Sequence, residues 1–263
     1  MKQLDKYSNI DFTTANLVYD GTNYFVVLTC YIDKKENTKN NNVCGIDMGV
    51  STSITLSNGT KYDISVGESE WLKRLQTQLS RKKKGSNNRY KTIKKIRKEY
   101  NYISNRKNDI SNKIVSKLLK EYNVIVLQDE QISKWRQDGF SGTKIQHSVL
   151  GRIKSKLIQS DNVIILDKWF PTTKYCSKCG NKVELKLTDR IFKCTICKEK
   201  EDRDIHATKN MIWFYLQYIN LLDEPGTDCT SIKKLVDRKV CYNDFLSKLK
   251  GKQESAKCNE LFH

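Results

Sequence analysis

Apolar and polar positions alternate with two different periods along the chain, and the first patterned stretch is strand-rich. Residues 15–33 contain two β-rich runs on either side of Asp20 and Gly21. Glycine accepts the positive φ that a tight turn demands, so this stretch predicts a β-hairpin. The polar segment that follows, residues 34–42, is interpreted as a linker.

Residues 43–64 continue with an apolar run, a β-branched run and a third run after Asn58 and Gly59. This pattern predicts a three-stranded meander. From residue 68 to residue 122 the period changes. Leucine and isoleucine recur there at helical spacing, which predicts helices.

Two later segments begin with uninterrupted apolar runs, which are typical of strands buried on both faces of a sheet. They are residues 123–135 and residues 162–170, and an amphipathic stretch at residues 144–159 predicts a helix between them. Residues 204–222 predict a further helix with Asp204 as its N-cap. The order of strands and helices indicates an open α/β sheet.

The overall charge suggests the class of partner. Lysine and arginine number 48 against 30 acidic residues, and the formal charge of +18 is typical of a protein that binds a polyanion. A composition generally rich in lysine and asparagine is the alternative explanation. No apolar run is long enough to span a bilayer, and the N-terminus lacks the apolar core of a signal peptide, so we expect a cytoplasmic protein with no membrane partner.

One segment concentrates the positive charge. Residues 81–98 contain ten basic residues and no acidic one, which favours contact with phosphates over the alternative of a solvated charged helix pair. Three tyrosines in this region, Tyr90, Tyr100 and Tyr102, are interpreted as core residues rather than as base-stacking ones. The candidate nucleic-acid-binding residues are Arg81, Lys82, Lys83, Lys84, Arg89, Lys91, Lys94, Lys95 and Arg97.

Four of the nine cysteines form two C-x-x-C pairs separated by fourteen residues. This is the spacing of a zinc ribbon, in which each pair offers two sulfurs to one ion, and Gly180 fits the turn after the first pair. Four thiolates leave no open coordination position, so the predicted zinc is structural; a redox dithiol is the alternative. The predicted ligands are Cys176, Cys179, Cys194 and Cys197.

Three carboxylates occupy positions at which strands and helices of an open sheet can converge. Asp47 lies within a strand, Glu130 follows a buried strand and Asp204 opens a helix. Hard oxygen ligands of this kind hold the two Mg²⁺ ions of phosphodiester hydrolases. At the middle position Gln128 and Glu130 share one face of the predicted strand, and we favour Glu130 because an amide brings no negative charge.

The order of motifs closely resembles the TnpB/OrfB proteins of bacterial insertion sequences, which are related to the CRISPR type V effector nucleases. The motifs are "GIDMGVSTSITLSNG", "LSRKKKGSNNRYK", "VIVLQDEQISKW", "FPTTKYCSKCG" and "DRDIHATKNM". The resemblance implies a RuvC-like nuclease domain of the RNase H fold. That domain has a mixed sheet with helices on both faces and a zinc ribbon inserted before its third motif.

The resemblance also implies roles for individual residues. Asp47 matches the first catalytic acid and Asp204 the third, while Glu130, or Gln128 in a stricter alignment, matches the second. Two Mg²⁺ or Mn²⁺ ions would be the catalytic cofactors and one zinc the structural one. His206 replaces the asparagine that the family usually carries in the third motif, and we expect it to lie near the metal ions.

The resemblance suggests a domain arrangement with a reduced N-terminal part. Family members carry a wedge domain and a helical recognition domain before the nuclease, so the early hairpin is interpreted as a wedge remnant in an N-terminally truncated chain. DNA is the expected partner, while a guide RNA is expected mainly in full-length relatives; the oligomeric state is left open. The expected divisions are a remnant and linker (1–42), the nuclease domain (43–170) with its basic helical insert (68–122), the zinc ribbon (171–201), the third-motif helix (202–223) and a loosely ordered polar tail (224–263).

Three functional hypotheses follow. The first is a metal-dependent DNA endonuclease that is guided by RNA in its full-length relatives. The second is a nuclease-inactive nucleic-acid-binding protein, such as a repressor or a transposon remnant. The third is an ATPase of the actin-like or sugar-kinase type, which "GIDMGVSTS" also resembles, although no second glycine-rich phosphate loop follows.

Overall fold

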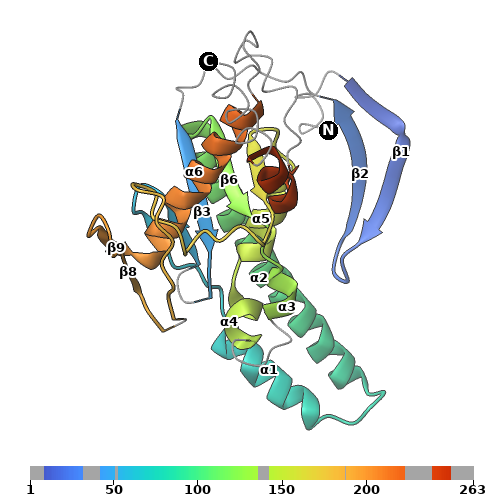
Figure 1. Ribbon diagram of the computed structural model, residues 1–263. Coiled ribbons are helices and arrows are strands. Elements are labelled where there is room, and N and C mark those ends of the chain that lie inside the picture. The colour runs from blue at the N-terminus through green and yellow to red at the C-terminus, as the bar shows by residue number, and fades with distance from the viewer. Residues whose placement is uncertain are drawn as a thin grey trace, which may run out of the picture. The chain divides into compact units, whose positions relative to one another are not determined.

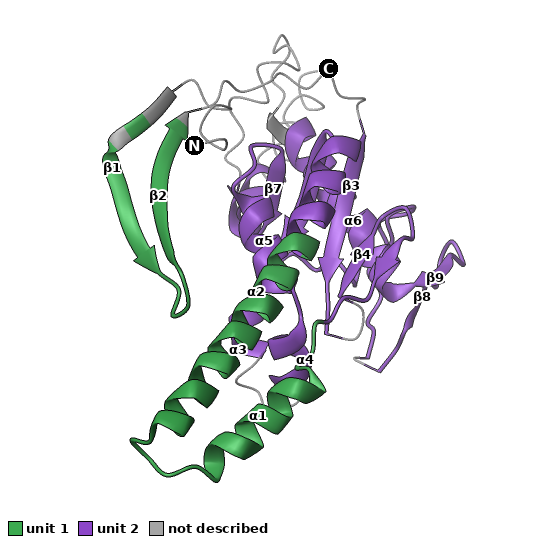
Figure 2. Ribbon diagram, turned by 180° about the vertical axis from the view of Figure 1, so that it is seen from behind, with its two compact units in different colours: residues 1–38, 66–110 green, residues 39–65, 111–263 purple. Residues whose placement is uncertain are grey.

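The computed structural model describes residues 9–31, 42–50, 53–135, 142–186, 188–222 and 239–249. The chain forms two compact units, shown in different colours in Figure 2. Residues 1–38 and 66–110 belong to the first unit, and residues 39–65 and 111–263 belong to the second. None of the helices that the structure describes is long and apolar enough to cross a membrane.

The first unit contains the predicted β-hairpin. Strand β1 (Asn9–Tyr19) pairs antiparallel with β2 (Tyr24–Tyr31), and β1 begins earlier than the sequence pattern indicates. Asp20 closes the turn because its Oδ1 accepts hydrogen bonds from the backbone N–H groups of Thr22 and Asn23, both at 2.7 Å. Gly21 adopts the expected positive φ of 87°.

The predicted helical region is also confirmed. Helix α1 (Glu70–Ser80) begins at the N-cap Ser69, whose hydroxyl accepts from the Leu72 N–H at 3.1 Å. Helix α2 (Asn87–Glu121) follows, and its residues 87–110 lie in the first unit. Leu72, Leu75 and Ile96 form the buried contact between the two helices, which run as a pair in Figure 1.

The second unit is built on a six-stranded mixed sheet with the strand order β10-β7-β6-β3-β4-β5. Neighbours β3, β4 and β5 run antiparallel as the predicted meander, whereas β6 is parallel to both β3 and β7, and β10 is parallel to β7. The strands are β3 (Val43–Met48), β4 (Ile54–Leu56), β5 (Lys61–Tyr62), β6 (Val124–Gln128), β7 (Val163–Leu166) and β10 (Lys239–Val240).

Helix α6 (Arg203–Leu222) covers one face of this sheet, where Met211 and Phe214 pack against Val126 of β6. In Figure 1 α6 runs along β3. Side chains alternate between the faces of a strand, so the neighbours of Val126 point to the opposite face, and they are also fully buried. Helix α5 (Leu150–Ile158) contacts β7 without joining the α6 cluster. Both faces of the central strands are therefore covered.

The single helix predicted for residues 144–159 is divided in the structure, which corrects that prediction. A short α4 (Gly142–His147) follows α3 (Ile132–Trp135), and α5 begins only at Leu150. Ser148 forms an isolated antiparallel bridge with Ser65. Because this bridge uses backbone groups that a continuous helix would need, the helix is interrupted there.

The expectation of a loosely ordered tail is wrong for residues 239–249. Strand β10 extends the sheet at β7, and the residues 242–249 that follow are helical. Val240 is fully buried and Phe245 is 5% exposed, both within the α6 cluster. The other residues of the predicted tail lie outside the described part of the chain.

Candidate functional site

The three predicted carboxylates line one open cavity of about 780 Å³ in the second unit. Asp47 comes from β3, Glu130 from the turn after β6 and Asp204 from the first turn of α6. The structure therefore brings together the candidate residues that are most distant in sequence. Five basic side chains line the same cavity: Lys144, Lys174, Lys186, Arg190 and Arg203.

The contact between β3 and α6 explains why Asp47 and Asp204 meet. A Cβ placed on Gly45 would lie 2.0 Å from the backbone oxygen of Thr208, so the helix backbone approaches the strand at a position that only glycine allows. Asp47 is on the same strand face as Gly45, and Asp204 lies one helical turn before Thr208. The close approach at Gly45 therefore places the two carboxylates in the same cavity.

The N-cap of α6 differs from the prediction. Asp202, not Asp204, caps the helix, because its Oδ1 accepts from the backbone N–H groups of Asp204 (3.0 Å) and Ile205 (3.2 Å). The other oxygen of Asp202 pairs with Lys61 at 2.8 Å. The carboxylate of Asp204 instead contacts Arg203, with an Nη2 to Oδ1 distance of 3.5 Å, and lines the cavity.

The electrostatics of the cavity disfavour several negative charges at once. Burial, together with the nearby charges of Asp204 and Glu130, raises the pKa of Asp47 to about 7, although Arg203 partly opposes this. Burial also raises the pKa of Glu130, against the opposing charge of Lys154. A bound cation would relieve both effects, so these carboxylates form a site that suits a positively charged ligand.

Gln128 and Glu130 both line the cavity, but in different ways. Strand β6 ends at Gln128, and the Glu130 N–H donates to the Gln128 carbonyl oxygen at 2.8 Å, which forms a tight turn. Glu130 is thus not the continuation of the strand that simple alternation predicts. The pairing of Ile46 with Leu127, continued by one residue, puts Gln128 beside Asp47.

The side chain of Gln128 holds the segment that follows β7. Its Nε2 donates to the carbonyl oxygens of Phe170 (2.9 Å) and Lys168 (3.1 Å), and its Oε1 accepts from the Thr172 hydroxyl at 3.0 Å. These partners require an amide, since a carboxylate could not donate to carbonyl oxygens. Sequence reasoning missed this role because the partners lie about forty residues away in the chain.

Asp129, between these two residues, is absent from the cavity lining and forms ion pairs instead. Its carboxylate pairs with Lys154 at 3.0 Å and with Lys239 of β10 at 3.1 Å. Lys154 also donates to the backbone oxygen of Glu130 at 2.5 Å. Lys154 therefore fixes the turn that carries Glu130.

The four predicted zinc ligands converge. Their sulfur atoms all lie within 4.8 Å of one another, and two Sγ pairs, Cys176 with Cys197 and Cys179 with Cys194, are 3.5 Å apart. Sulfur atoms bound tetrahedrally at about 2.3 Å would be separated by roughly 3.8 Å, so the cluster fits a zinc ion. Among the described residues no other group of three or more His, Cys, Asp or Glu ligand atoms is this compact.

Each cysteine pair ends in the same backbone geometry. The residue after the second cysteine has a positive φ in both cases, 69° at Gly180 and 60° at Lys198. The two-stranded sheet of β8 (Ile191–Lys193) and β9 (Lys200–Asp202) joins the second pair to α6. This repeated turn explains how both pairs present their sulfurs to one point.

His206 lies away from the cavity, contrary to expectation. Its buried ring stacks on Phe192 of β8 at 3.6 Å between ring centroids, and its Nε2 donates to the Tyr175 carbonyl oxygen at 2.7 Å. Asn210 on the same helix donates to the carbonyl oxygens of Tyr175 and Thr172, both at 2.6 Å. His206 and Asn210 thus fasten the cysteine-bearing segment to α6.

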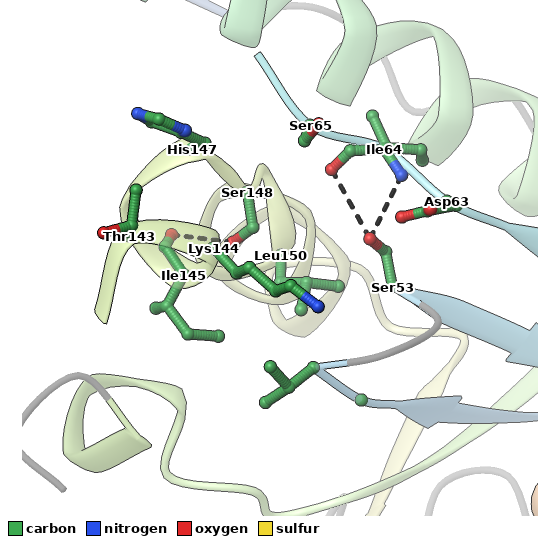
Figure 3. Close-up of a pocket in the computed structure, with 12 residues that line it drawn as sticks. Ser53, Asp63, Ile64, Ser65, Thr143, Lys144, Ile145, His147, Ser148 and Leu150 are labelled. Carbon is green, nitrogen blue, oxygen red and sulfur yellow. Dashed lines mark hydrogen bonds between the residues drawn. The ribbon is translucent and has the colours of Figure 1, made fainter. Parts of the chain in front are cut away.

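A smaller cavity of about 190 Å³ lies beside the carboxylate cavity, and Gly49, Val50 and Lys144 line both. Figure 3 shows the smaller one, with the Ser53 hydroxyl bonded to the backbone N–H and carbonyl groups of Ile64. None of the three candidate catalytic carboxylates lines it. Of the two cavities, only the larger one therefore contains the three candidate carboxylates.

In the first unit, two of the nine candidate nucleic-acid-binding residues are engaged in the turn between α1 and α2. Lys82 donates to the Thr92 hydroxyl at 2.6 Å, and Arg89 donates to the Leu79 carbonyl oxygen at 2.6 Å, which caps the end of α1. The remaining seven are exposed.

The tyrosines of this unit do not belong to the core, which corrects the prediction made for them. Tyr90, Tyr100 and Tyr102 are 65%, 44% and 61% exposed. The helical contact is made by Leu72, Leu75 and Ile96 instead.

Comparisons with known protein families support the resemblance seen in the motifs. Residues 26–136 match the family model OrfB_IS605, described as "Probable transposase", and residues 149–211 match the model of the Cas12f1-like TNB domain. The predicted relationship to the TnpB/OrfB proteins is confirmed by these two matches.

Two curated relatives carry the name "Putative RNA-guided DNA endonuclease". The one from Streptomyces pristinaespiralis is 29% identical over 198 residues, which covers 72% of this chain and 49% of the relative. The other, InsQ from Escherichia coli (strain K12), is 29% identical over 196 residues, with 64% and 48% covered. The chain spans about half the length of these relatives. A cryo-EM structure titled as the Cas12f1-sgRNA-target DNA complex is 20% identical, with a TM-score of 0.44, and the match covers 72% of this chain and 41% of that one.

Proposed function

The chain is a relative of the TnpB/OrfB proteins, and from this premise we propose that it is a metal-dependent DNA endonuclease with a RuvC-like, RNase H-type nuclease domain. The observation that carries the proposal is the cavity lined jointly by Asp47, Glu130 and Asp204. The mixed sheet with α6 packed on β3 supports the fold assignment. The domain divisions expected from the sequence remain part of the proposal.

The three carboxylates would hold two Mg²⁺ or Mn²⁺ ions. Oxygen ligands of this kind suit Mg²⁺, which keeps several of its waters and so needs few protein carboxylates. Such ions, when bound, supply an activated water and stabilise charge on the leaving oxygen. A bound cation would favour the ionised form of Asp47, since burial and the neighbouring acids are what raise its pKa.

The basic residues of the cavity would position the substrate. Lys174, Lys186 and Arg190 line the cavity from the cysteine-bearing segment, and Lys144 lines it from α4. Phosphate groups are attracted by such a cationic lining, which fixes the register of a nucleic acid without reading its sequence. DNA is the proposed substrate, and a guide RNA is proposed because the curated relatives are named for RNA guidance.

The four cysteines would hold a structural zinc ion. Its role would be to fold the segment between β7 and α6, since four thiolates leave no position for a substrate. Through the stacking of His206 on Phe192, that segment also supports the helix that carries Asp204.

Cleavage of DNA with and without Mg²⁺, in the presence of any copurifying RNA, tests the proposal. Asp47→Ala and Asp204→Ala should each lower the cleavage rate by at least about a hundredfold. Asp63→Asn is the matched control, because Asp63 is exposed and does not line the carboxylate cavity; it should keep wild-type activity. Equal cleavage by the wild type and both alanine variants would overturn the proposal.

A second candidate function, nucleic-acid binding without cleavage, is favoured by one observation. The neutral Gln128 lines the same cavity as Asp47, and the strand register continued by one residue from Ile46 and Leu127 makes the two residues neighbours. If the metal site needs a charge there, the wild type will bind nucleic acid but not cut it.

The variant Gln128→Glu separates the two candidates. If Glu130 is the third metal ligand, this variant should lose stability by about 1–3 kcal/mol, because carbonyl oxygens lose their donor, and it should gain no activity. If Gln128→Glu cleaves DNA and the wild type does not, the wild type is a protein that binds nucleic acid without cleaving it.

A further inference from the structure

Within the first unit, helix α2 carries an exposed row of tyrosine and basic side chains. Residues four apart on a helix are neighbours on its surface, so Tyr90, Lys94, Lys98, Tyr102 and Arg106 form one continuous ridge. All five are exposed, and the two tyrosines are 65% and 61% exposed. We call these five residues the tyrosine–lysine ridge.

The two lysines of the ridge have no acid three or four residues away on the helix, whereas Arg106 has Asp109 three residues later. Glu99 is the only acid between residues 87 and 106, and it is turned toward α1, where its Oε1 accepts from the Ser69 hydroxyl at 2.7 Å. An ordinary solvated helix pairs its lysines with acids three or four residues away. Lys94 and Lys98 therefore offer positive charge without a neighbouring acid on the helix, beside the exposed rings of Tyr90 and Tyr102.

We propose that the tyrosine–lysine ridge binds unpaired nucleotides, with Tyr90 and Tyr102 stacking on bases and Lys94, Lys98 and Arg106 contacting phosphates. The inference rests on the proposed function only in taking nucleic acid as the partner. A duplex hides the faces of its bases within the stack, so it could use the cations but not the tyrosine rings. A single strand exposes both its phosphates and its base faces.

The geometry fits several successive nucleotides. Neighbouring ridge side chains are roughly 6 Å apart, and Tyr90 and Tyr102 are about 18 Å apart along the helix axis. The two rings would therefore stack on different bases, with the two lysines following the backbone between them. Tyr100 does not lie on the ridge, because it points toward α1 and accepts from the Gln76 amide at 3.0 Å.

Fluorescence anisotropy without added Mg²⁺ tests the inference on the full chain. The probes are an oligothymidylate, an oligouridylate and a DNA duplex of equal length. Tyr90→Ala with Tyr102→Ala should weaken single-strand binding by roughly 20-fold or more, given the usual contribution of a base stacked on an aromatic side chain. Duplex binding should change by less than about twofold, and the dependence of the single-strand affinity on salt should keep its slope.

Three variants serve as controls. Tyr90→Phe with Tyr102→Phe keeps both rings and should retain wild-type affinity. Tyr100→Ala removes an exposed tyrosine outside the ridge and should also bind normally. Lys94→Gln with Lys98→Gln should reduce the salt slope for single strands by about 1.4.

The outcomes separate this inference from the proposed function. Single-strand binding that is unaffected by the double alanine variant, or an equal loss for duplex and single strand, would refute stacking by the ridge and leave the cleavage test untouched. A wild type that binds none of the probes would refute the nucleic-acid partner itself. Comparison of the two single-stranded probes shows whether RNA or DNA is preferred.

Discussion

At the scale of single residues, Gly45 determines whether the candidate site can form. The backbone of α6 approaches β3 so closely there that a methyl group would overlap the Thr208 carbonyl oxygen. Asp47 lies two residues after Gly45 on β3, and Asp204 lies one helical turn before Thr208 on α6. A change at Gly45 would therefore separate the two carboxylates without altering either one.

Gly45→Ala should lower the free energy of unfolding by about 3 kcal/mol or more. The added methyl group would overlap the backbone of α6 at Thr208, which cannot move aside as a flexible side chain could. Gly151→Ala is the matched control, since Gly151 lies in α5 with no atom within 4 Å of an added Cβ. It should stabilise the protein by about 0.5–1 kcal/mol. Chemical denaturation measures both, and equal effects would contradict the close approach.

The pKa of Asp47 predicts a pH dependence of stability in the metal-free protein. Its folded-state pKa of about 7 exceeds the ordinary value of 3.8. Below pH 3.8 Asp47 is neutral in both the folded and the unfolded protein, so its ionisation does not change the free energy of unfolding. As the pH rises from 3.8 to 7 only the unfolded chain releases the proton, so stability is lost, by at most about 4 kcal/mol above pH 7.

Asp47→Asn removes this dependence because an amide does not ionise. Without Mg²⁺, the variant should exceed the wild type in stability at pH 8 by a clearly larger margin than at pH 5. Added Mg²⁺ should narrow the difference at pH 8, since it binds the ionised wild type. Denaturation curves at the two pH values measure this difference in the free energy of unfolding. An equal difference at pH 5 and pH 8 would argue against a raised pKa of Asp47 from burial and neighbouring acids.

Sequence reasoning found the candidate residues but not all of their contacts. Asp202 and Asp204 are two residues apart, and either suits an N-cap, so the pattern could not tell the cap from the cavity residue. The amide network of Gln128 depends on carbonyl oxygens of a segment about forty residues later. Such contacts are set by the tertiary fold and leave no local signal.

At the scale of elements, the segment that carries the four clustered cysteines combines two equivalent turns with different residues. Gly180 adopts a positive φ at no steric cost, whereas Lys198 adopts one at a cost of about 1–2 kcal/mol for a residue with a Cβ. The predicted motif included the glycine but gave no sign that the second turn repeats it. The equivalence became visible only through the backbone angles.

Lys198→Gly should therefore leave the zinc-loaded protein as stable as the wild type or up to about 1 kcal/mol more stable, while Gly180→Ala should lose about 1–2 kcal/mol. Lys193→Gly makes the same exchange within β8 and should destabilise. Thermal unfolding and the rate of zinc loss to a chelator measure these effects. Destabilisation by Lys198→Gly as large as that by Lys193→Gly would speak against the shared turn.

Secondary structure was predictable where a local pattern was strong. The hairpin, the meander and both buried strands carry turn residues or continuous apolar runs, and all of them were found. The predicted helix at residues 144–159 is divided because Ser148 pairs with Ser65, a partner that no local pattern reveals. Strand β10 has only two residues, so it gave no periodic signal at all.

At the scale of the whole molecule, the second unit depends on its last described segment. Phe245 packs with Phe170 and Phe214, whose ring centroids lie 5.6 and 5.8 Å away. Phe245→Ala should cost about 3–5 kcal/mol, whereas Asp244→Ala, at an exposed neighbouring position, should stay within about 0.5 kcal/mol. Urea denaturation tests this, and similar midpoints for the two variants would show that the segment does not stabilise the core.

The parallel pairing of β10 with β7 has a consequence for biosynthesis. Leu166 of β7 pairs with Val240 of β10, so the outer edge of β7 has no strand partner until Val240 has been synthesised. At ordinary rates of translation the ribosome needs roughly 4 to 15 s to add the intervening residues. During that interval the outer edge of β7 has no strand partner, so a chaperone that binds the nascent chain should raise the yield of correctly folded protein.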